Sequence, residues 1–410
     1  MPTEIDPSTV GLSREGLAAV DAAIQTHIDR GIIAGAVMVV ARHGRICHRV
    51  AQGHRDIASG APAGIDDLFR IFSMTKPVTA AAMLLLWDEG RWSLDDPIAL
   101  HLPEFADLRV FAGHNEDGSV RLDPVDRPPT LRDLFTHSAG FSYGTSLSDP
   151  GDPVDAAYQA ADVWRAPDLR SMIARLSLQP LAYQPGSSWR YSLSMDVQGA
   201  VVERLTGRSL GAFLEERLFQ PLGMDDTRFH TPDSERGRLS TLYLKAGDAP
   251  LTQIPNPMFA DSSDEPSLAL GGAGLVSTAG DYLRFASMLL GKGVHDGVRV
   301  LSVDAVDLMT RNHLPDSLLA NTFAVGHQRI GPGAGFGLNG IVFTDPALAG
   351  AKVGRGTYQW DGAAGTWFWI DPENDLVFVG MTQTLSYTAP ALQAETQALI
   401  AAALVAGGTA

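Results

Sequence analysis

The chain has 410 residues, 45% of them hydrophobic and 19% charged, and its 31 Lys and Arg against 47 Asp and Glu give a formal net charge of −16. This composition is typical of a folded protein with a large core and argues against a disordered chain. The acidic balance would repel nucleic acid and anionic membranes, so it favours a small molecule as the partner and leaves the oligomeric state open.

The cysteine, the histidines and the apolar runs of the sequence exclude further classes of protein. Cys47 is the single cysteine, which excludes an internal disulfide and a cysteine metal cluster and predicts a buried, inert thiol. The histidines form no His-Glu-x-x-His or similar cluster, so we expect no metal and no cofactor. The first residues lack a secretory signal, and the longest apolar runs, 31–41 and 398–408, are too short to span a bilayer. We therefore expect a cytoplasmic protein without a membrane span.

Both ends of the chain predict a helix beside an antiparallel hairpin, because helical spacing alternates there with short β-rich stretches and turn residues. The expected elements are a helix over 11–30, strands over 36–40 and 46–50 joined at His43-Gly44, strands over 366–370 and 376–379 joined by 371–374, and a helix over 390–405. The middle of the chain is richer in helical patterns, with exposed polar loops expected at 113–126 and 261–266.

This order predicts an α/β protein of the α+β type, with a central antiparallel sheet flanked by helices and an additional, mostly helical region. We expect a discontinuous sheet domain formed by residues 1–85 and 265–410, interrupted by the helical region 86–264. An active site would lie naturally between the two.

The first chemical motif is Ser73-Met74-Thr75-Lys76. Residues 76–87 are apolar nearly all round, which predicts a helix buried on every side that stops near Gly90. Pro77 is tolerated only in a first helical turn, so the helix must begin close to Ser73. The free N–H groups and positive dipole end at that position can stabilise the oxyanion of a tetrahedral intermediate.

Lys76 follows Ser73 by three residues, so both side chains share one helix face. In an apolar site the neutral amine is favoured, and it can take or relay the serine proton, or hold a tyrosine phenolate that does. An isolated Ser-x-x-Lys is more often a serine N-cap with a solvated lysine. The buried helix argues against that alternative here.

Two further motifs supply partners for this pair. Tyr191 lies on a turn-rich loop, 184–194, before a helix expected over 195–206 with Ser194 as its cap, and its phenol could act as general base and acid. The stretch 360–365, Trp-Asp-Gly-Ala-Ala-Gly, is expected to open the strand of the C-terminal hairpin, where small residues let the backbone approach a ligand. Taken alone, Tyr191 would be an anchoring aromatic residue and Trp360 a core residue.

Together these motifs resemble the family VIII carboxylesterases, which are similar to class C β-lactamases and penicillin-binding proteins. The resemblance covers nearly the whole chain and rests on Ser73-Met74-Thr75-Lys76, Tyr191-Ser192-Leu193 and Trp360-Asp361-Gly362, supported by 134–140, 221–224 and 271–278. It implies a serine β-lactamase-like fold and an acyl-enzyme on Ser73, with Lys76 and Tyr191 as its catalytic partners. It also implies oxyanion donors at the backbone N–H groups of Ser73 and Ala363 and substrate contacts at Trp360 and Gly362.

Two departures from β-lactamases bear on the substrate. Those enzymes have asparagine at the position of Leu193 and a Lys-Thr-Gly triplet at the position of 360–362, so a β-lactam carboxylate would lose its cation here. We therefore expect a carboxylesterase for small, short-chain esters. The alternatives are β-lactamase or acyltransferase activity from the same site, or a penicillin-binding-type binder without turnover.

Three other patterns are weaker. Residues 140–144, Gly-Phe-Ser-Tyr-Gly, match a nucleophile elbow by letter, but the expected strand before Ser142 and helix after it are missing. Residues 335–340 match a dinucleotide fingerprint, but a strand rather than a helix is expected after them, so a hairpin edge is favoured. His137 is interpreted as a histidine that fixes a loop.

Overall fold

The computed structural model describes residues 3–145, 151–256, 261–386 and 390–405. Within this part of the chain, the centre is an eight-stranded antiparallel sheet with strand order β14-β15-β16-β17-β18-β1-β2-β3. Its strands are β1 Gly35–Arg42, β2 Arg45–Asp56, β3 Ala61–Pro62, β14 Ala334–Phe336, β15 Ile341–Phe343, β16 Tyr358–Gly362, β17 Thr366–Asp371 and β18 Leu376–Met381.

The two ends of the chain meet in this sheet. β1 pairs with β2 on one side and with β18 on the other, and Val39 lies opposite Arg49 and Val379. Both β1 and β18 are buried nearly throughout, as expected of central strands covered on both faces. The predicted fold, a central antiparallel sheet with helices and a further helical part, is confirmed.

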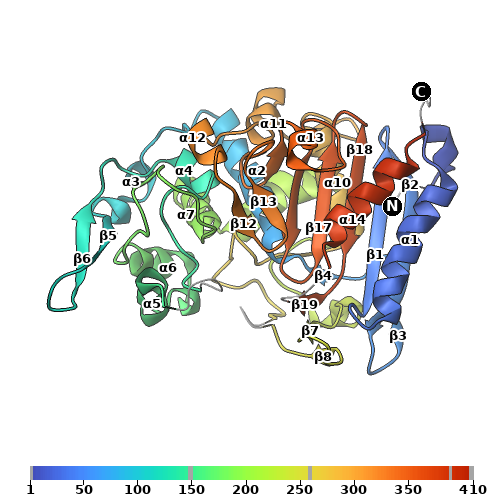
Figure 1. Ribbon diagram of the computed structural model, residues 1–410, viewed down its shortest axis with the longest axis horizontal. Helices are drawn as coiled ribbons and strands as arrows, with labels where there is room; N and C mark the ends of the chain where they lie inside the picture. The colour runs from blue at the N-terminus through green and yellow to red at the C-terminus, as the bar shows by residue number, and fades with distance from the viewer. Residues whose placement is uncertain (1–2, 146–150, 257–260, 387–389, 406–410) are drawn as a thin grey trace.

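Helices cover both faces of the sheet (Figure 1). α1 Arg14–Asp29 and α14 Leu392–Ala403 lie side by side on one face, where Val20 and Ile24 share a core with Met38, Val40 and Trp367. α10 Ala279–Leu290 packs against β17, β18 and β1 on the other face. The larger core on that face also takes in α2 Thr75–Asp88, whose residues Thr75 to Leu86 are all buried.

The remaining helices are α3 Ile98–His101, α4 Leu131–Phe135, α5 Pro153–Ala160, α6 Leu169–Leu176, α7 Ser194–Thr206, α8 Leu210–Leu214, α9 Gln220–Leu222, α11 Val303–Met309, α12 Asp316–Leu319 and α13 Pro346–Ala349. Of these, α3 to α7 and α12 lie to the left of the sheet in Figure 1, with the hairpin of β5 Arg109–His114 and β6 Val120–Pro124 at the far end of the molecule. α7 packs against α2, α4 and α6, which places the loop before α7 beside the start of α2.

Short strands complete the fold. They are β4 Phe69–Arg70 with β9 Val276–Ser277, β5 Arg109–His114 with β6 Val120–Pro124, β7 Tyr243–Lys245 with β8 Thr252–Gln253 and β19 Thr384–Ser386, β10 Val294–His295 with β11 Val298–Arg299, and β12 Phe323–Val325 with β13 Gln328–Ile330. The short helical turns are η1 Pro7–Val10, η2 Phe72–Met74, η3 Pro103–Phe105, η4 Val163–Arg165, η5 Glu215–Phe219 and η6 Asp233–Arg238.

Three local predictions were wrong in detail. Much of 113–126, expected as a loop, belongs to the β5–β6 hairpin, because its main-chain pairing needs no buried face. Ser194 does not cap α7; it is the first residue of that helix, and its hydroxyl shares a hydrogen bond with Ser192 instead. Residues 360–362 end a separate strand, β16, rather than opening β17.

Cys47 is buried and unbridged, and burial raises the pKa of its thiol to about 11, as expected of an inert cysteine. In the part of the chain that the structure describes, no helix has the length and apolar character needed to cross a bilayer. Residues 406–408 of the second apolar run lie outside that part.

Candidate active site

Ser73 lies in the short 3-10 turn η2, which runs directly into α2. Its neighbours Phe72 and Met74 are buried, whereas Ser73 is partly exposed. Phe72 has a backbone φ of 42°, a conformation that costs a bulky residue about 1–3 kcal/mol. The buried Phe72 ring, which packs with Leu242 and Ala364, holds this backbone in place. The backbone is thus strained at the residue that directly precedes Ser73 and sets its position.

The Ser73 hydroxyl receives two hydrogen bonds. Lys76 Nζ lies 3.0 Å from Ser73 Oγ, and the Tyr191 phenol donates to the same oxygen at 2.7 Å. The structure therefore brings together the three side chains that the sequence motifs singled out, although Tyr191 is 118 residues from Ser73.

Lys76 is completely buried, and its ammonium group has fixed partners besides Ser73. Nζ donates to the Gly272 carbonyl at 2.6 Å and lies 4.7 Å from the ring centre of Tyr191. Burial lowers the pKa of Lys76 to about 7, although the nearby carboxylates of Asp196 and Asp361 act in the opposite direction. A substantial fraction of Lys76 is therefore a neutral amine at neutral pH.

Asp196 is a site residue that the sequence motifs missed. It is fully buried on α7, and its Oδ1 accepts the Gly272 N–H at 3.0 Å while its Oδ2 has no partner among the described residues. Burial raises the pKa of Asp196 to about 6, and the Lys76 charge opposes this rise. Gly272 thus joins the two groups, since its N–H binds Asp196 and its carbonyl binds Lys76.

Tyr191 is held on its loop by aromatic and histidine contacts. His137, at a φ of 57°, packs its ring 4.7 Å from that of Tyr191, and its Nδ1 accepts the Ser192 N–H at 3.1 Å. This is the geometry expected of a histidine that fixes a loop. Burial raises the pKa of the Tyr191 phenol, while its hydrogen bond to Ser73 acts in the opposite direction. Free Tyr191 is therefore a neutral phenol at neutral pH.

Aromatic rings line the site on both sides. Tyr143 stacks against Tyr191 at 5.1 Å and against Trp164 at 5.2 Å between ring centres. Across Tyr191, the buried Trp360 ring lies 5.7 Å away, with Phe336 edge-on to it. The sequence motifs missed Tyr143 as a site residue, because it appeared only inside the nucleophile-elbow pattern. These rings favour an apolar group beside Ser73.

The end of β16 approaches the backbone before Ser73. A Cβ on Gly362 would lie 2.4 Å from the Ile71 carbonyl oxygen, so only glycine fits at this contact. Ala363 follows as an exposed residue in the turn to β17. The structure thus places the turn that contains Ala363 near the 3-10 turn that contains Ser73.

The nucleophile-elbow pattern at 140–144 and the dinucleotide pattern at 335–340 have structural roles. Ser142 is buried in an irregular segment, and its hydroxyl hydrogen-bonds Asp155, which pairs with Arg190. Residues 335–340 join β14 to β15 at the sheet edge, as predicted. Asn339 in this segment has a φ of 62° and donates to the Lys76 carbonyl at 2.8 Å, so it fixes the first turn of α2. The described residues contain no group of His, Cys, Asp and Glu that could hold a metal.

Known proteins are similar to this chain over most of its length. The family model described as Beta-lactamase matches residues 20–403. Esterase EstB of Burkholderia gladioli is 34% identical, over 93% of this chain and 94% of its own, and the lovastatin esterase of Penicillium rubens is 32% identical, over 89% and 92%. Among solved structures, EstCE1, described as a hydrolase with promiscuous acyltransferase activity, superposes with a TM-score of 0.75 at 28% identity, covering 94% of this chain and 98% of that one.

Proposed function

The chain belongs to the β-lactamase family, and we propose that it is a carboxylesterase of that family, which hydrolyses small, short-chain esters through an acyl-enzyme on Ser73. One observation carries the proposal: Ser73 Oγ lies within hydrogen-bond distance of both Lys76 Nζ and the Tyr191 phenol. The esterases among the relatives support the choice of substrate class.

Lys76 and Tyr191 have different roles in the proposed reaction. The neutral Lys76 amine takes the Ser73 proton as Oγ attacks the ester carbonyl, and the Tyr191 phenol gives its proton to the departing alkoxide. The Lys76 ammonium then reprotonates Tyr191. In the second half, Tyr191 takes the proton of an attacking water and passes its own phenolic proton to the neutral Lys76 amine. The Lys76 ammonium then protonates Ser73 Oγ as the bond from Oγ to the acyl carbon breaks and the carboxylic acid leaves. The backbone N–H groups of Ser73 and Ala363 are proposed as donors to the oxyanion.

The charges around Ser73 favour a neutral ester over a β-lactam. The cation closest to Ser73 is Lys76, and its charge is already offset by Asp196 and Asp361. Leu193 and Trp360 are both buried, and neither can bind a substrate carboxylate. A ligand with a free carboxylate would therefore meet carboxylates and aromatic rings instead of a cation.

Acyl transfer to an alcohol is a second activity of the same site. The structural neighbour EstCE1, with its promiscuous acyltransferase activity, is the observation that favours it. Adding an alcohol to an ester hydrolysis reaction would show transfer as a new ester product, at the expense of the free acid.

Labelling the protein with a fluorophosphonate tests the proposed nucleophile directly. We expect one adduct, located by mass spectrometry of the digested protein on the peptide that contains Ser73. The same preparation, assayed on p-nitrophenyl esters of increasing chain length, should favour short acyl chains and lose this activity as labelling proceeds. An adduct on Ser142, or full activity after complete labelling of Ser73, would contradict the proposal.

The pH dependence of hydrolysis should follow Lys76. Because the neutral amine is the base and its pKa is about 7, kcat/KM should fall tenfold per pH unit below that value and level off above it. The Asp196 carboxylate raises the pKa of Lys76. In Asp196→Asn the acidic limb of the pH profile, where kcat/KM falls, should therefore shift to lower pH by about one unit. Asp281→Asn, which changes a buried carboxylate on α10, serves as the control and should leave the limb in place. A limb that moved to higher pH in Asp196→Asn would rule out this role.

A further inference from the structure

A cavity of about 500 Å³ lies on the other side of the 136–138 segment from Tyr191. Thr136 and Ser138 line it, whereas His137 between them contacts Ser192 and Tyr191. The cavity is therefore separate from the Ser73 site but adjoins it through one stretch of backbone. Its full lining is Arg127, Arg132, Asp133, Thr136, Ser138, Gly186, Arg311, Asn312, His313, Leu314, Pro315 and Leu318.

Three guanidinium groups face one carboxylate in this lining. Arg127 binds the buried Asp133 with two hydrogen bonds, at 2.6 and 2.9 Å, so the charges of these two side chains neutralise each other. Arg132 binds Asp95, whose side chain is 80% exposed and therefore only weakly neutralises it. Arg311 is exposed and forms no ion pair among the described residues.

His313 adds no positive charge but contacts Arg132. Its Nδ1 lies 3.2 Å from Arg132 Nη1, and its Nε2 is bound to the Leu308 carbonyl at 2.7 Å. Burial, together with the charges of Arg132 and Arg311, lowers the pKa of His313 to about 4. The neutral imidazole therefore holds Arg132 in place in a cavity that Arg311 also lines.

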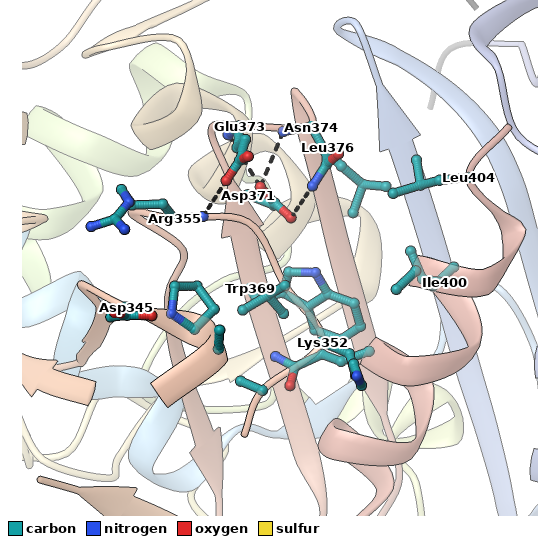
Figure 2. Close-up of a pocket in the computed structure, with 16 residues that line it drawn as sticks. Asp345, Lys352, Arg355, Trp369, Asp371, Glu373, Asn374, Leu376, Ile400 and Leu404 are labelled. Atoms are coloured by element: carbon teal, nitrogen blue, oxygen red, sulfur yellow. Dashed lines mark hydrogen bonds between the residues drawn. The ribbon is translucent and has the colours of Figure 1, made fainter. Parts of the chain in front are cut away.

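A groove of similar volume elsewhere shows that this charge balance is not general. The groove in Figure 2, between α13, α14 and the end of β17, is also about 500 Å³. Its charged side chains are three carboxylates, Asp345, Asp371 and Glu373, and two cations, Lys352 and Arg355. The chain as a whole has a net charge of −16, so the excess of cations in the cavity lined by Thr136 and Ser138 differs from the overall charge of the protein.

Apolar residues also line the cavity. They are the buried Leu314 and Leu318, with Pro315 between them on the chain. A ligand that fills the space must therefore combine an anionic end with an apolar body. A carboxylate is the anion that matches a planar guanidinium with two parallel hydrogen bonds.

We propose that this cavity is a second ligand site, which binds a small organic carboxylate with its anionic end on Arg311 and Arg132 and its apolar body on Leu314, Pro315 and Leu318. The site does not depend on the reaction at Ser73. Its ligand is a monoanion of about the size of hexanoate or benzoate.

Isothermal titration calorimetry with hexanoate at constant ionic strength tests the site. We expect one-site binding to the unmodified chain, weaker binding of acetate and of inorganic phosphate, and none of hexan-1-ol. Arg311→Gln should weaken hexanoate binding roughly tenfold, because a charge-assisted pair is lost, and Arg311→Lys should fall between the two.

Lys352→Gln is the matched control, because it removes a cation from the groove of Figure 2. It should leave hexanoate binding unchanged. Arg311 is exposed and has no ion pair with the residues that the structure describes, so its variants should unfold at the same temperature as the unmodified chain, which thermal unfolding checks. Hexanoate binding that is as tight in Arg311→Gln as in the unmodified chain, that is lost in Lys352→Gln, or that is matched by phosphate would overturn the proposal.

Discussion

Replacing Ser73 with alanine should reduce kcat/KM for a short-chain p-nitrophenyl ester by at least about 10⁴-fold, because it removes the proposed nucleophile on which the acyl-enzyme would form. The remaining Lys76 and Tyr191 keep their positions, since Lys76 is also bound to Gly272 and Tyr191 is packed against His137. Binding of the substrate should change little. The loss is therefore expected in kcat, and the protein should stay folded.

Ser142→Ala is the control for that experiment, because Ser142 belongs to the competing nucleophile-elbow pattern. Its hydroxyl hydrogen-bonds Asp155, which keeps its ion pair with Arg190, so the substitution should cost about 1–2 kcal/mol of stability. Activity should stay within a few-fold of the unmodified chain. If Ser142→Ala lost hydrolysis and Ser73→Ala kept it, the assignment of the nucleophile would be wrong.

The parts of the site that local patterns could predict rest on residues close together in the chain, whereas Tyr191, 118 residues from Ser73, was joined to it only through the resemblance to a family. The apolar run after Ser73 predicted a helix buried on every side, and that burial in turn predicted an unsolvated Lys76. The structure has both. The hairpin turn at His43-Gly44 and the strands around 371–374 were likewise local patterns and were confirmed.

The parts that the sequence could not predict depend on distant segments that meet. Asp196 follows Tyr191 by five residues, but an aspartate in the first turn of a helix is ordinarily a partner of the helix dipole. Its role beside Lys76 is visible only because Gly272, 76 residues away, bridges the two. Asn339 and Tyr143 are similar cases, since nothing near them in the chain indicates Lys76 or Tyr191 as a neighbour.

The local errors have a physical reason as well. A serine before a helix usually caps it, but the hydroxyl of Ser194 is bound to Ser192, which is itself held by His137. The contacts that Ser192 makes with Ser194 and His137 therefore outweigh the preference of Ser194 for the helix cap. β6 is exposed along its whole length, so it carries no alternating pattern that would set it apart from a polar loop.

Replacing Lys76 with methionine should reduce kcat/KM by about 10³- to 10⁴-fold, because the base is lost while the shape of the side chain is kept. Lys76→Arg separates the base from its charge. A guanidinium keeps the positive charge but does not release its proton, so Lys76→Arg should be impaired about as strongly as Lys76→Met. Activity within tenfold of the unmodified chain in Lys76→Arg would show that the charge alone suffices.

The stability of Lys76→Met should depend on pH through Asp196. Burial already raises the pKa of this carboxyl, and loss of the Lys76 charge, which lowers it, should raise it further. A folded-state pKa above the unfolded value means that folding takes up a proton, so the variant should be most stable at low pH. It should lose up to about 1.4 kcal/mol per pH unit, relative to the double variant Lys76→Met with Asp196→Asn, as the pH rises toward the folded-state pKa. Urea unfolding of both variants at pH 5 and pH 8 measures this difference. The double variant lacks the carboxyl that titrates, so a loss of the same size between pH 5 and pH 8 in the double variant would place its source elsewhere.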